Sequence, residues 1–314
     1  MTFLHTAKLL MAGVVTIAAL GLGAAQPAEK FDLSPDISYR ARAEKDEGAI
    51  KAIAKDYSFV APGKLTIGIH PWDPPIATHA TDAKTVVGAD PDIAQLIADS
   101  LGLELDLVVV AWADWPLGVS SGKYDAVISN VTVTEERKEK FDFSTYRKDV
   151  LGFYVRSDSK ITSIREPKDV AGLKVTVGAG TNQEKILLEW DRQNVAAGLK
   201  PIEVQYYDDS AAEDLALQSD RVDVIFDPNS PRAYAAALNG KTKLVGIVSG
   251  GWPLTADIAV TTRKGAGLAE AITIAINDLI ANGKYGEVLS RWNVEAEAVD
   301  KAQTNPPGLP KSGS

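Results

Sequence analysis

The residues best suited to ligand chemistry lie in the segment 129–137, where hydroxyl and amide side chains precede an arginine. Ser129, Asn130 and Thr132 follow a short apolar run, and Arg137 comes five residues after Thr132. A guanidinium presents a planar fork that pairs with both oxygens of a carboxylate, and hydroxyls and helix N-terminal amides satisfy the remaining lone pairs. The segment therefore indicates a carboxylate-binding site. The alternative on chemistry alone is that Arg137 is one more solvated charge in the run Glu-Glu-Arg-Lys-Glu-Lys.

A second candidate is the segment 178–183, which reads Gly-Ala-Gly-Thr-Asn-Gln. Gly178 and Gly180 let a backbone approach a ligand closely, and Thr181 has the position of a helix N-cap. The spacing matches no nucleotide-binding fingerprint, since neither a Walker lysine nor the third glycine of the dinucleotide motif is present. On the residues alone, the segment is interpreted as a plain strand-to-helix turn.

Both segments need a scaffold that brings strand ends together. From residue 63 onward, apolar runs of strand length alternate with helical patterns, which is α/β organisation. The strand-length runs are 64–70, 104–110, 126–128, 174–177, 202–205 and 222–226. Because open α/β sheets bind ligands at the carboxyl ends of their strands, two segments that each follow such a run fit a ligand site.

The spacing of two further apolar runs predicts the domain organisation. The runs 151–155 and 258–262 flank a central block of roughly 100 residues, which suits one domain inserted into another. We therefore predict two lobes joined by two chain crossings. The predicted divisions are a signal peptide (1–25), an N-terminal extension (26–62), lobe 1 (63–149), lobe 2 (150–250), the return part of lobe 1 (251–297) and a flexible C-terminal tail (298–314), the last because of its Pro, Gly and Ser content.

Composition excludes several classes of function. The chain has 314 residues, 45% hydrophobic and 24% charged, which is typical of a globular protein with a substantial core. Its net charge of -9 would repel a phosphate backbone, so we expect no nucleic acid partner. The absence of cysteine excludes disulfides, thiolate metal sites and a cysteine nucleophile, and three scattered histidines make a metal cluster improbable. We expect no metal and no cofactor.

The N-terminus is typical of an export signal. Lys8 precedes the apolar run 9–20, and small residues at 23–25 offer a cleavage site after Ala25. The alternative, an uncleaved membrane anchor, is disfavoured because the run is well short of the ~20 apolar residues that a span needs. Without a cysteine for lipidation, the mature protein would diffuse away from a cell with a single membrane. We therefore expect it in a Gram-negative periplasm.

At this point the chain resembles a known family, the periplasmic binding proteins for polar amino acids (solute-binding protein family 3). These are the solute-capture subunits of ATP-driven (ABC) uptake systems. The resemblance spans roughly residues 63–295. It rests on KLTIGIHPWDPP at 64–75, GADPDIA at 88–94, SGKYDAVISNVTVTEER at 121–137, FDFS at 141–144, VGAGT at 177–181 and NGKYGEVLSRW at 282–292, in the family's order.

The resemblance implies a fold and a function. The fold is the α/β, two-lobed type II periplasmic binding protein fold, in which each lobe is a mixed β-sheet flanked by helices and a two-stranded hinge joins them. The function is capture of a polar amino acid or a zwitterionic derivative between the lobes, and delivery to an inner-membrane ABC permease with its ATPase. No reaction is required, and we expect a monomer.

The resemblance also implies roles for individual residues. Arg137 is similar to the family's clamp for the ligand carboxylate. Lobe 1 would add Ser129, Asn130 and Thr132, and lobe 2 would close with Gly178, Thr181, Asn182 and Gln183. Trp112 falls where the family places an apolar side chain against the ligand, so it would cover a ligand face or stack on a cation. The alternative for Trp112 is simple core packing.

Two positions depart from the family pattern. Asp73 stands where an aromatic residue is usual, with Trp72 just ahead of it. Where the family commonly has an aspartate for the ligand amine, this chain has a proline between Asp227 and Asn229. The amine could therefore meet Asp227, Asn229 or Asp73, or the ligand could be an N-substituted opine or an ectoine-like solute. In either case the acids predict that neutral or cationic ligands bind better than glutamate or aspartate.

Two rival functions remain at the level of sequence. The first is a dehydratase-like enzyme on the same fold, with Asp73 or Asp227 as a buried proton donor, although neither residue sits in a spacing specific to catalysis. The second is the sensor domain of a receptor, which we disfavour because the sequence shows neither a later membrane span nor a signalling domain.

Overall fold

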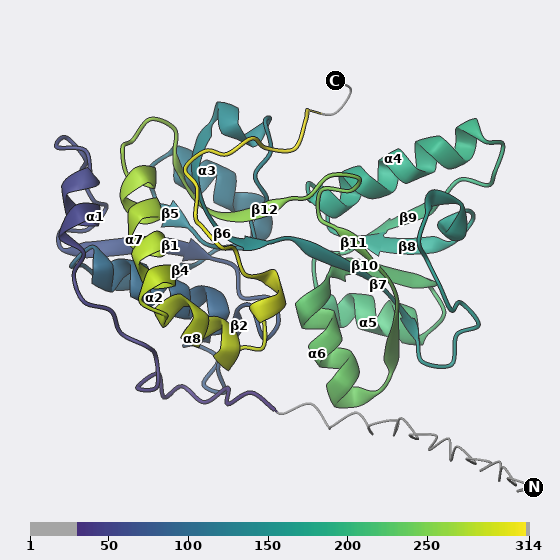
Figure 1. Ribbon diagram of the computed structural model, residues 1–314. Helices are drawn as coiled ribbons and strands as arrows, with labels where there is room; N and C mark the ends of the chain where they lie inside the picture. The colour runs from purple at the N-terminus through teal and green to yellow at the C-terminus, as the bar shows by residue number, and fades with distance from the viewer. Residues whose placement is uncertain (1–29, 312–314) are drawn as a thin grey trace, which may run out of the picture.

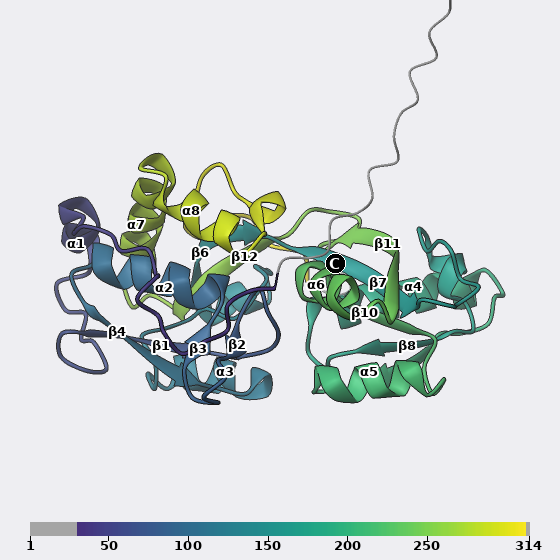
Figure 2. The same cartoon turned by 90° about the horizontal axis from the view of Figure 1, so that it is seen from below.

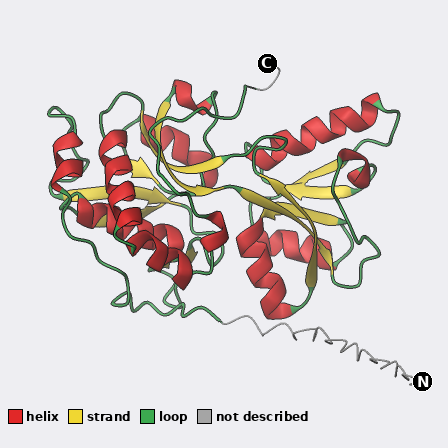
Figure 3. Cartoon of the chain, viewed as in Figure 1, coloured by secondary structure: helices red, strands yellow, loops and turns green. Residues whose placement is uncertain are grey.

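The computed structural model of the protein describes residues 30–311, and these form two lobes side by side (Figure 1). Each lobe holds one five-stranded sheet with helices packed against it (Figure 3). The predicted signal peptide, 1–25, lies outside the described residues. Two mixed sheets, each flanked by helices, confirm the α/β fold predicted from the sequence.

Lobe 1 contains a sheet with strand order β4-β1-β5-β12-β6. The strands are β1 (Lys64–Ile69), β4 (Glu104–Val109), β5 (Ala126–Val127), β6 (Phe141–Lys148) and β12 (Asp257–Arg263). β1 runs parallel to β4 and β5, and β12 runs antiparallel to β5 and β6. A two-stranded ribbon, β2 (Thr78–His79) with β3 (Val86–Val87), lies beside it.

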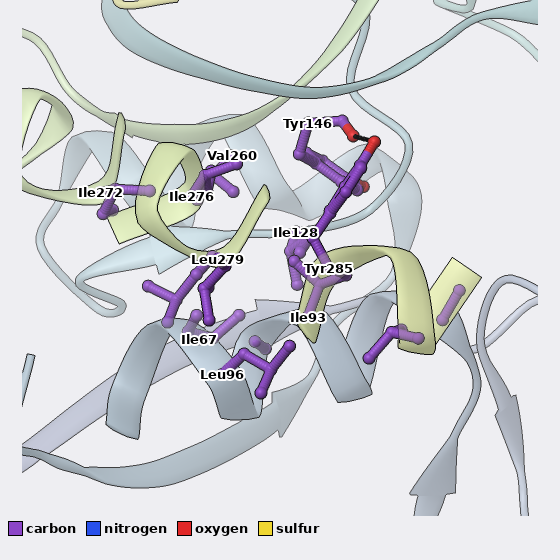
Figure 4. Packing of buried hydrophobic residues seen from close by; sticks show 14 of the residues in the cluster. Ile67, Ile93, Leu96, Ile128, Tyr146, Val260, Ile272, Ile276, Leu279 and Tyr285 are labelled. Carbon is purple, nitrogen blue, oxygen red and sulfur yellow. Dashed lines mark hydrogen bonds between the residues drawn. The ribbon is translucent and has the colours of Figure 1, made fainter. Parts of the chain in front are cut away.

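Helices cover both faces of this sheet. They are α1 (Glu47–Ala52), α2 (Ala89–Ser100), α3 (Trp115–Ser120), α7 (Ala269–Ala281) and α8 (Lys284–Arg291). The larger apolar cluster packs α2, α7 and α8 against one face, while α3 packs with Phe141 and Phe143 on the other. Within the larger cluster, the Tyr285 hydroxyl donates to the Tyr146 carbonyl at 2.7 Å, so this buried phenol is satisfied (Figure 4).

Lobe 2 contains a sheet with strand order β11-β7-β10-β8-β9. The strands are β7 (Val150–Arg156), β8 (Lys174–Val177), β9 (Glu203–Tyr206), β10 (Val224–Pro228) and β11 (Thr242–Ser249). The helices are α4 (Asn182–Ala196), α5 (Ser210–Gln218) and α6 (Asn229–Asn239). α4 packs in one apolar cluster, and α5 and α6 pack in another.

Two chain crossings join the lobes, at Asp149 between β6 and β7 and at 250–256 between β11 and β12 (Figure 2). The crossings are hydrogen-bonded to each other: the Asp149 amide donates to the Ala256 carbonyl at 2.9 Å, and the Gly250 amide donates to the Asp149 carbonyl at 3.0 Å. A Cβ atom on Gly250 would lie 2.1 Å from the Asp149 carboxyl group, so this close approach requires glycine. The result is the predicted two-stranded hinge.

Helix starts follow the local sequence with one shift. Thr181 caps α4 as predicted, because its hydroxyl oxygen accepts the Glu184 amide at 3.2 Å. For α5, Ser210 with Glu213 three residues later predicts a capping box, but the N-cap is one residue earlier, at Asp209, whose carboxylate accepts the Ala212 amide at 2.8 Å. Aspartate and serine both cap well, so the pair Asp-Ser does not decide between the two positions.

The C-terminal segment differs from the flexible tail that we expected for 298–314. Residues 303–305 lie along β6, which is an edge strand of its sheet, and Leu309 pairs with the loop at 133–135. The Asn305 amide donates to the Phe143 carbonyl at 2.9 Å, and the Leu309 amide donates to the Val133 carbonyl at 3.0 Å. An edge strand has backbone groups that no neighbouring strand pairs, and hydrogen bonds to the C-terminal segment satisfy some of them. The segment itself has no hydrophobic periodicity that would predict this pairing.

The described part of the N-terminal extension, 30–62, also packs on lobe 1. The Arg40 guanidinium binds the buried carboxylate of Asp92 at 2.8 Å, and Arg42 binds Asp99 at 2.6 Å. Both acids belong to α2, so the first half of the described extension is fixed to this helix.

Candidate functional site

A cavity of about 250 Å³ lies between the lobes. Much of its lining lies at the carboxyl ends of the parallel strands: His70, Trp72 and Asp73 after β1, 111–113 after β4, Gly178, Ala179 and Thr181 after β8, 207–210 after β9, and 227–228 at the end of β10. Open α/β sheets place ligand sites at such ends. Its walls come from both lobes, so a ligand there contacts both.

Several residues predicted from the sequence line this cavity: Trp72, Asp73, Trp112, Gly178, Thr181 and Asp227. The Trp72 and Trp112 rings are nearly parallel, with an interplanar angle of 15° and centroids 6.1 Å apart. The His70 ring meets Trp72 edge-on at 5.6 Å. Lobe 1 therefore offers the ligand an aromatic wall beside the Asp73 carboxylate.

Arg137 lies beside the cavity, outside its lining, and its guanidinium bridges the two lobes. Nη1 donates to the Thr132 carbonyl at 2.9 Å, and Nη2 donates to the Gly180 carbonyl of lobe 2 at 3.3 Å. The guanidinium also lies 5.7 Å from the centroid of Trp112. Burial lowers the pKa of Arg137 to about 10, so the group remains cationic at neutral pH. Carbonyls rather than carboxylates contact it at hydrogen-bond distance, which leaves its charge available for an anionic ligand group.

The other polar residues of the first segment are engaged with the chain itself. The Ser129 hydroxyl oxygen accepts the His70 backbone amide at 2.6 Å, and the Asn130 side-chain oxygen Oδ1 accepts from Arg147 at 2.8 Å. The Thr132 hydroxyl donates to the Asp149 carboxylate in the hinge at 2.8 Å. None of these three predicted ligand residues lines the cavity; in this structure they fix its wall and the hinge.

The remaining predicted residues lie at two helix starts of lobe 2 and also do not line the cavity. Asn182 and Gln183, in the first turn of α4, are each 5% exposed. The side-chain nitrogen of Asn182, Nδ2, is buried with no hydrogen-bond partner among the described residues. The Asn229 side-chain oxygen accepts from the Tyr154 hydroxyl at 2.9 Å. Asn229 is therefore already engaged, whereas Asn182 retains an unused donor.

A buried charge cluster on lobe 2 was not predicted from the sequence. The Arg232 guanidinium binds Asp227 at 2.8 Å, Asp214 at 2.8 Å and also Glu213. Glu213 and Asp227 line the cavity. Three acidic side chains surround one guanidinium, so this wall of the cavity carries more acidic than basic groups.

The cluster and its surroundings shift the pKa values of its members. Burial raises the pKa of Glu213 to about 8, with repulsion from Asp227 adding to it and Arg232 opposing it. Burial likewise raises the pKa of Asp227, and Arg232 opposes this shift while Asp73, from lobe 1, adds to it. The cluster thus carries a carboxyl group that titrates near neutral pH beside the ligand cavity.

The residues that sequence analysis missed have weak sequence signals. His70 and Tyr207 follow strand ends, and that position is the one signal that would have found them. Arg232 and Glu213 come from two different helices, α6 and α5. Their pairing depends on how the helices pack, which no local motif records.

These features define a class of protein. The chain forms two lobes on a two-stranded hinge, with a cavity between them whose walls carry aromatic and charged groups. Among residues 30–311, no helix combines the length and the apolar character needed to cross a membrane. Such a molecule captures a small solute between its lobes. The chain belongs to the bacterial extracellular solute-binding proteins, family 3, whose family model matches residues 65–295.

Relatives and solved structures agree with this assignment. The L-cystine-binding protein TcyJ of Escherichia coli K12 is 31% identical over 249 residues, which cover 79% of this chain and 86% of that protein. The arginine-binding protein ArgT of Corynebacterium glutamicum is 27% identical over 77% of this chain and 78% of its own length. An ancestral arginine-binding protein bound to arginine superposes with a TM-score of 0.64 at 28% identity, covering 73% of this chain and 98% of the other.

The family resemblance stated from the sequence motifs is therefore confirmed. The relatives are binding proteins, so the chain is a solute-binding protein and the rival function of a cleft enzyme is not supported.

Proposed function

We propose that the protein captures a polar amino acid in the interlobe cavity and delivers it to the permease of an ABC transporter. The observation that carries the proposal is the pairing of opposite charges at one cavity. A cationic guanidinium, Arg137, lies against the Trp112 ring, and the acid-rich cluster around Arg232 lines the same cavity through Asp227 and Glu213. A zwitterion has the complementary charges.

In this proposal each wall of the cavity binds one part of the ligand. Arg137 exchanges its weak bond to the Gly180 carbonyl for the ligand carboxylate, because a charged acceptor binds a guanidinium more strongly than a neutral one. The ligand amine meets Asp227 or Asp73, since Asn229 is held by Tyr154. Trp72 and Trp112 cover the ligand's apolar or guanidinium face.

The relatives support an amino acid as ligand. Those named above bind L-cystine and arginine, and a glutamine-binding ABC transporter protein of Bacillus subtilis is 27% identical over 68% of this chain. The acid-rich lobe 2 wall favours neutral or cationic members of this group over dicarboxylates, with opines and ectoine as further candidates.

Location and partners follow from the same proposal. The family is extracellular, and the export signal predicted at 1–25 supports a periplasmic location for the mature protein. The partners are an inner-membrane permease and its ATPase, with the protein acting as a monomer.

Titration calorimetry with arginine, cystine, glutamine, histidine, glutamate, aspartate, octopine and ectoine tests the proposal directly. We expect saturable binding of at least one neutral or cationic member. Arg137→Ala should reduce that affinity by ~100-fold or more, because breaking a buried ion pair costs ~3 to 5 kcal/mol. Arg192→Ala, which removes an exposed arginine paired with Glu189 on α4, is the matched control and should bind normally. Near-native affinity in Arg137→Ala would remove the carboxylate clamp from the proposal.

A further inference from the structure

The N-terminal segment is fixed to lobe 1 ahead of the span that the family model matches. Arg40 and Arg42 bind two acids of α2, and the Thr81 amide donates to the Leu33 carbonyl at 2.9 Å. These contacts lie on either side of the bend at 34–39. The segment therefore moves with lobe 1 when the lobes move.

The start of this segment reaches lobe 2. The Phe31 amide donates to the Tyr234 hydroxyl oxygen on α6 at 3.1 Å, and the two ring centroids are 4.5 Å apart. The Phe31 ring also lies 5.1 Å from the ring of Trp292, the C-cap residue of α8 in lobe 1. Phe31 thus lines a groove of about 1520 Å³ to which both lobes contribute.

The lobe 1 side of this contact is rigid. The Asp92 carboxylate accepts both from Arg40 at 2.8 Å and from the Trp292 indole at 2.8 Å. One buried carboxylate therefore fixes both the N-terminal segment and the Trp292 side chain. Phe31 and Trp292 together form the lobe 1 surface that faces Tyr234.

The lobes contact each other on the cleft side as well. Arg137 donates to the Gly180 carbonyl, and Lys185 of α4 forms an ion pair with Glu136. These bonds join residues of different lobes, so the arrangement described is a closed one. A movement of the lobes that separates Tyr234 from lobe 1 would break its contacts with Phe31 and expose the Phe31 ring.

We propose that Phe31 is a latch between the lobes that stabilises the closed arrangement from outside the ligand cavity. It joins the lobes at a place separate from the two hinge crossings and from the Arg137–Gly180 and Lys185–Glu136 contacts on the cleft side. Because a ligand held by both lobes binds the closed form, a larger closed population raises the apparent affinity without any contact to the ligand. The effect on affinity rests on the proposed capture of a ligand between the lobes, whereas the effect on lobe arrangement does not.

The lobe arrangement can be measured without any ligand. The chain has no cysteine, so Leu117→Cys on α3 and Leu215→Cys on α5 introduce two unique sites for spin labels. Both leucines are exposed, at 74% and 61%, and the residues beside these helices, Ala113 and Ser210, line opposite walls of the cavity. Figure 2 shows α3 and α5 on the same side of the molecule. Double electron–electron resonance then reports lobe opening as a longer distance.

In this labelled background, Phe31→Ala should shift the ligand-free distribution to longer distances. Tyr234→Ala, which removes the partner on lobe 2, should produce the same shift, and the double variant should add little to either, since both delete one contact. Phe59→Ala is the matched control, because Phe59 belongs to the same extension and packs on lobe 1 through Tyr57. It should leave the distances unchanged.

With L-arginine as the probe ligand, Phe31→Ala should weaken binding about fivefold, mainly through faster dissociation, as expected for one lost aromatic contact. Identical ligand-free distances in wild type, Phe31→Ala and Tyr234→Ala would overturn the latch. If the distances lengthen but no amino acid binds even the wild type, the latch stands and the proposed function fails.

Discussion

Glu213 is the cavity residue whose charge responds to pH near neutrality. Burial raises its pKa to about 8, so its carboxyl group gains a negative charge as the pH rises through that value. A cationic side chain in the cavity should therefore bind more tightly at pH ~8.5 than at pH ~6.5, by up to ~10-fold for one added charge.

The comparison of two ligands isolates this effect. L-glutamine shares the α-amino and α-carboxyl groups of L-arginine but lacks its charge, so calorimetry with both separates the side-chain response from titration of the ligand amine. Glu213→Gln should remove the extra pH dependence of arginine. If arginine and glutamine respond identically to pH in the wild type, Glu213 does not face the ligand side chain.

Asp149 carries a second buried charge, in the hinge. Burial raises its pKa to about 6, although the Thr132 hydroxyl opposes the shift. The same carboxyl group titrates near 3.9 in the unfolded chain, so between these values the folded state binds more protons and stability falls as the pH rises. The Asp149→Asn variant lacks this titration, and its amide oxygen can still accept from Thr132. Between pH ~4.5 and ~7, the decrease in its free energy of unfolding should therefore be ~2 kcal/mol smaller than the decrease in the wild type. Urea unfolding at both pH values measures this, and equal pH dependence in the two proteins would contradict it.

Individual residues show where sequence reasoning succeeds at this scale. Trp112 and Asp73 lie in segments directly after strands, so a motif in the sequence is enough to bring them to the cavity. Arg137 was found in the same way, but its bond to Gly180 depends on how the lobes meet. Arg232 lies only five residues after Asp227, so that pair is local, whereas Glu213 reaches Arg232 only through the packing of α5 and α6 and could not be predicted.

At the scale of elements, the C-terminal segment braces the loop that carries Arg137. Leu309 pairs with Thr134, and the Glu135 amide donates to the Leu309 carbonyl at 2.8 Å. The Leu309 side chain also reaches Gly251 in the second hinge crossing, since a Cβ atom on that glycine would lie 2.5 Å from it. One short segment thus connects the edge of the sheet, the Arg137 loop and the hinge.

Deleting residues 303–314 should therefore destabilise lobe 1. The deletion removes several backbone hydrogen bonds, each contributing ~1 kcal/mol, so we expect the free energy of unfolding to drop by ~3 kcal/mol. Hydrogen exchange should increase at 133–135 and along β6. Deletion of 312–314 alone is the control. An unchanged unfolding midpoint and unchanged exchange would show that the segment does not brace the loop.

Some elements are determined by neighbouring residues in the sequence, and others by contacts with distant parts of the chain. Strands such as β1 and the cap of α4 follow from patterns within a few residues, and the sequence predicted them to within one or two positions. The C-terminal segment has no periodicity of its own, and its partner Phe143 is 162 residues away from Asn305 in the chain. Composition predicted a flexible end there, because composition records no long-range partner.

At the scale of the whole molecule, charge affects both the association rate of a ligand and its affinity for the cavity. The chain carries a net charge of -9, and the cavity adds the acids Asp73, Asp227 and Glu213 against one neighbouring guanidinium on lobe 2. A second carboxylate on a ligand would be repelled during approach and would then meet an acidic wall. We expect glutamate and aspartate to bind at least ~10-fold more weakly than the best neutral or cationic ligand, a difference of ~1.4 kcal/mol.

Competition of these ligands for one labelled amino acid, at low and at high salt, measures the preference and identifies its origin. Added salt screens exposed charges, so the association rate of arginine should fall with ionic strength while the affinity gap set inside the closed cavity persists. A gap that vanishes in high salt would assign the selectivity to the surface of the molecule instead of the cavity. Tightest binding by a dicarboxylate at either salt concentration would mean that the acids of lobe 2 face away from the ligand.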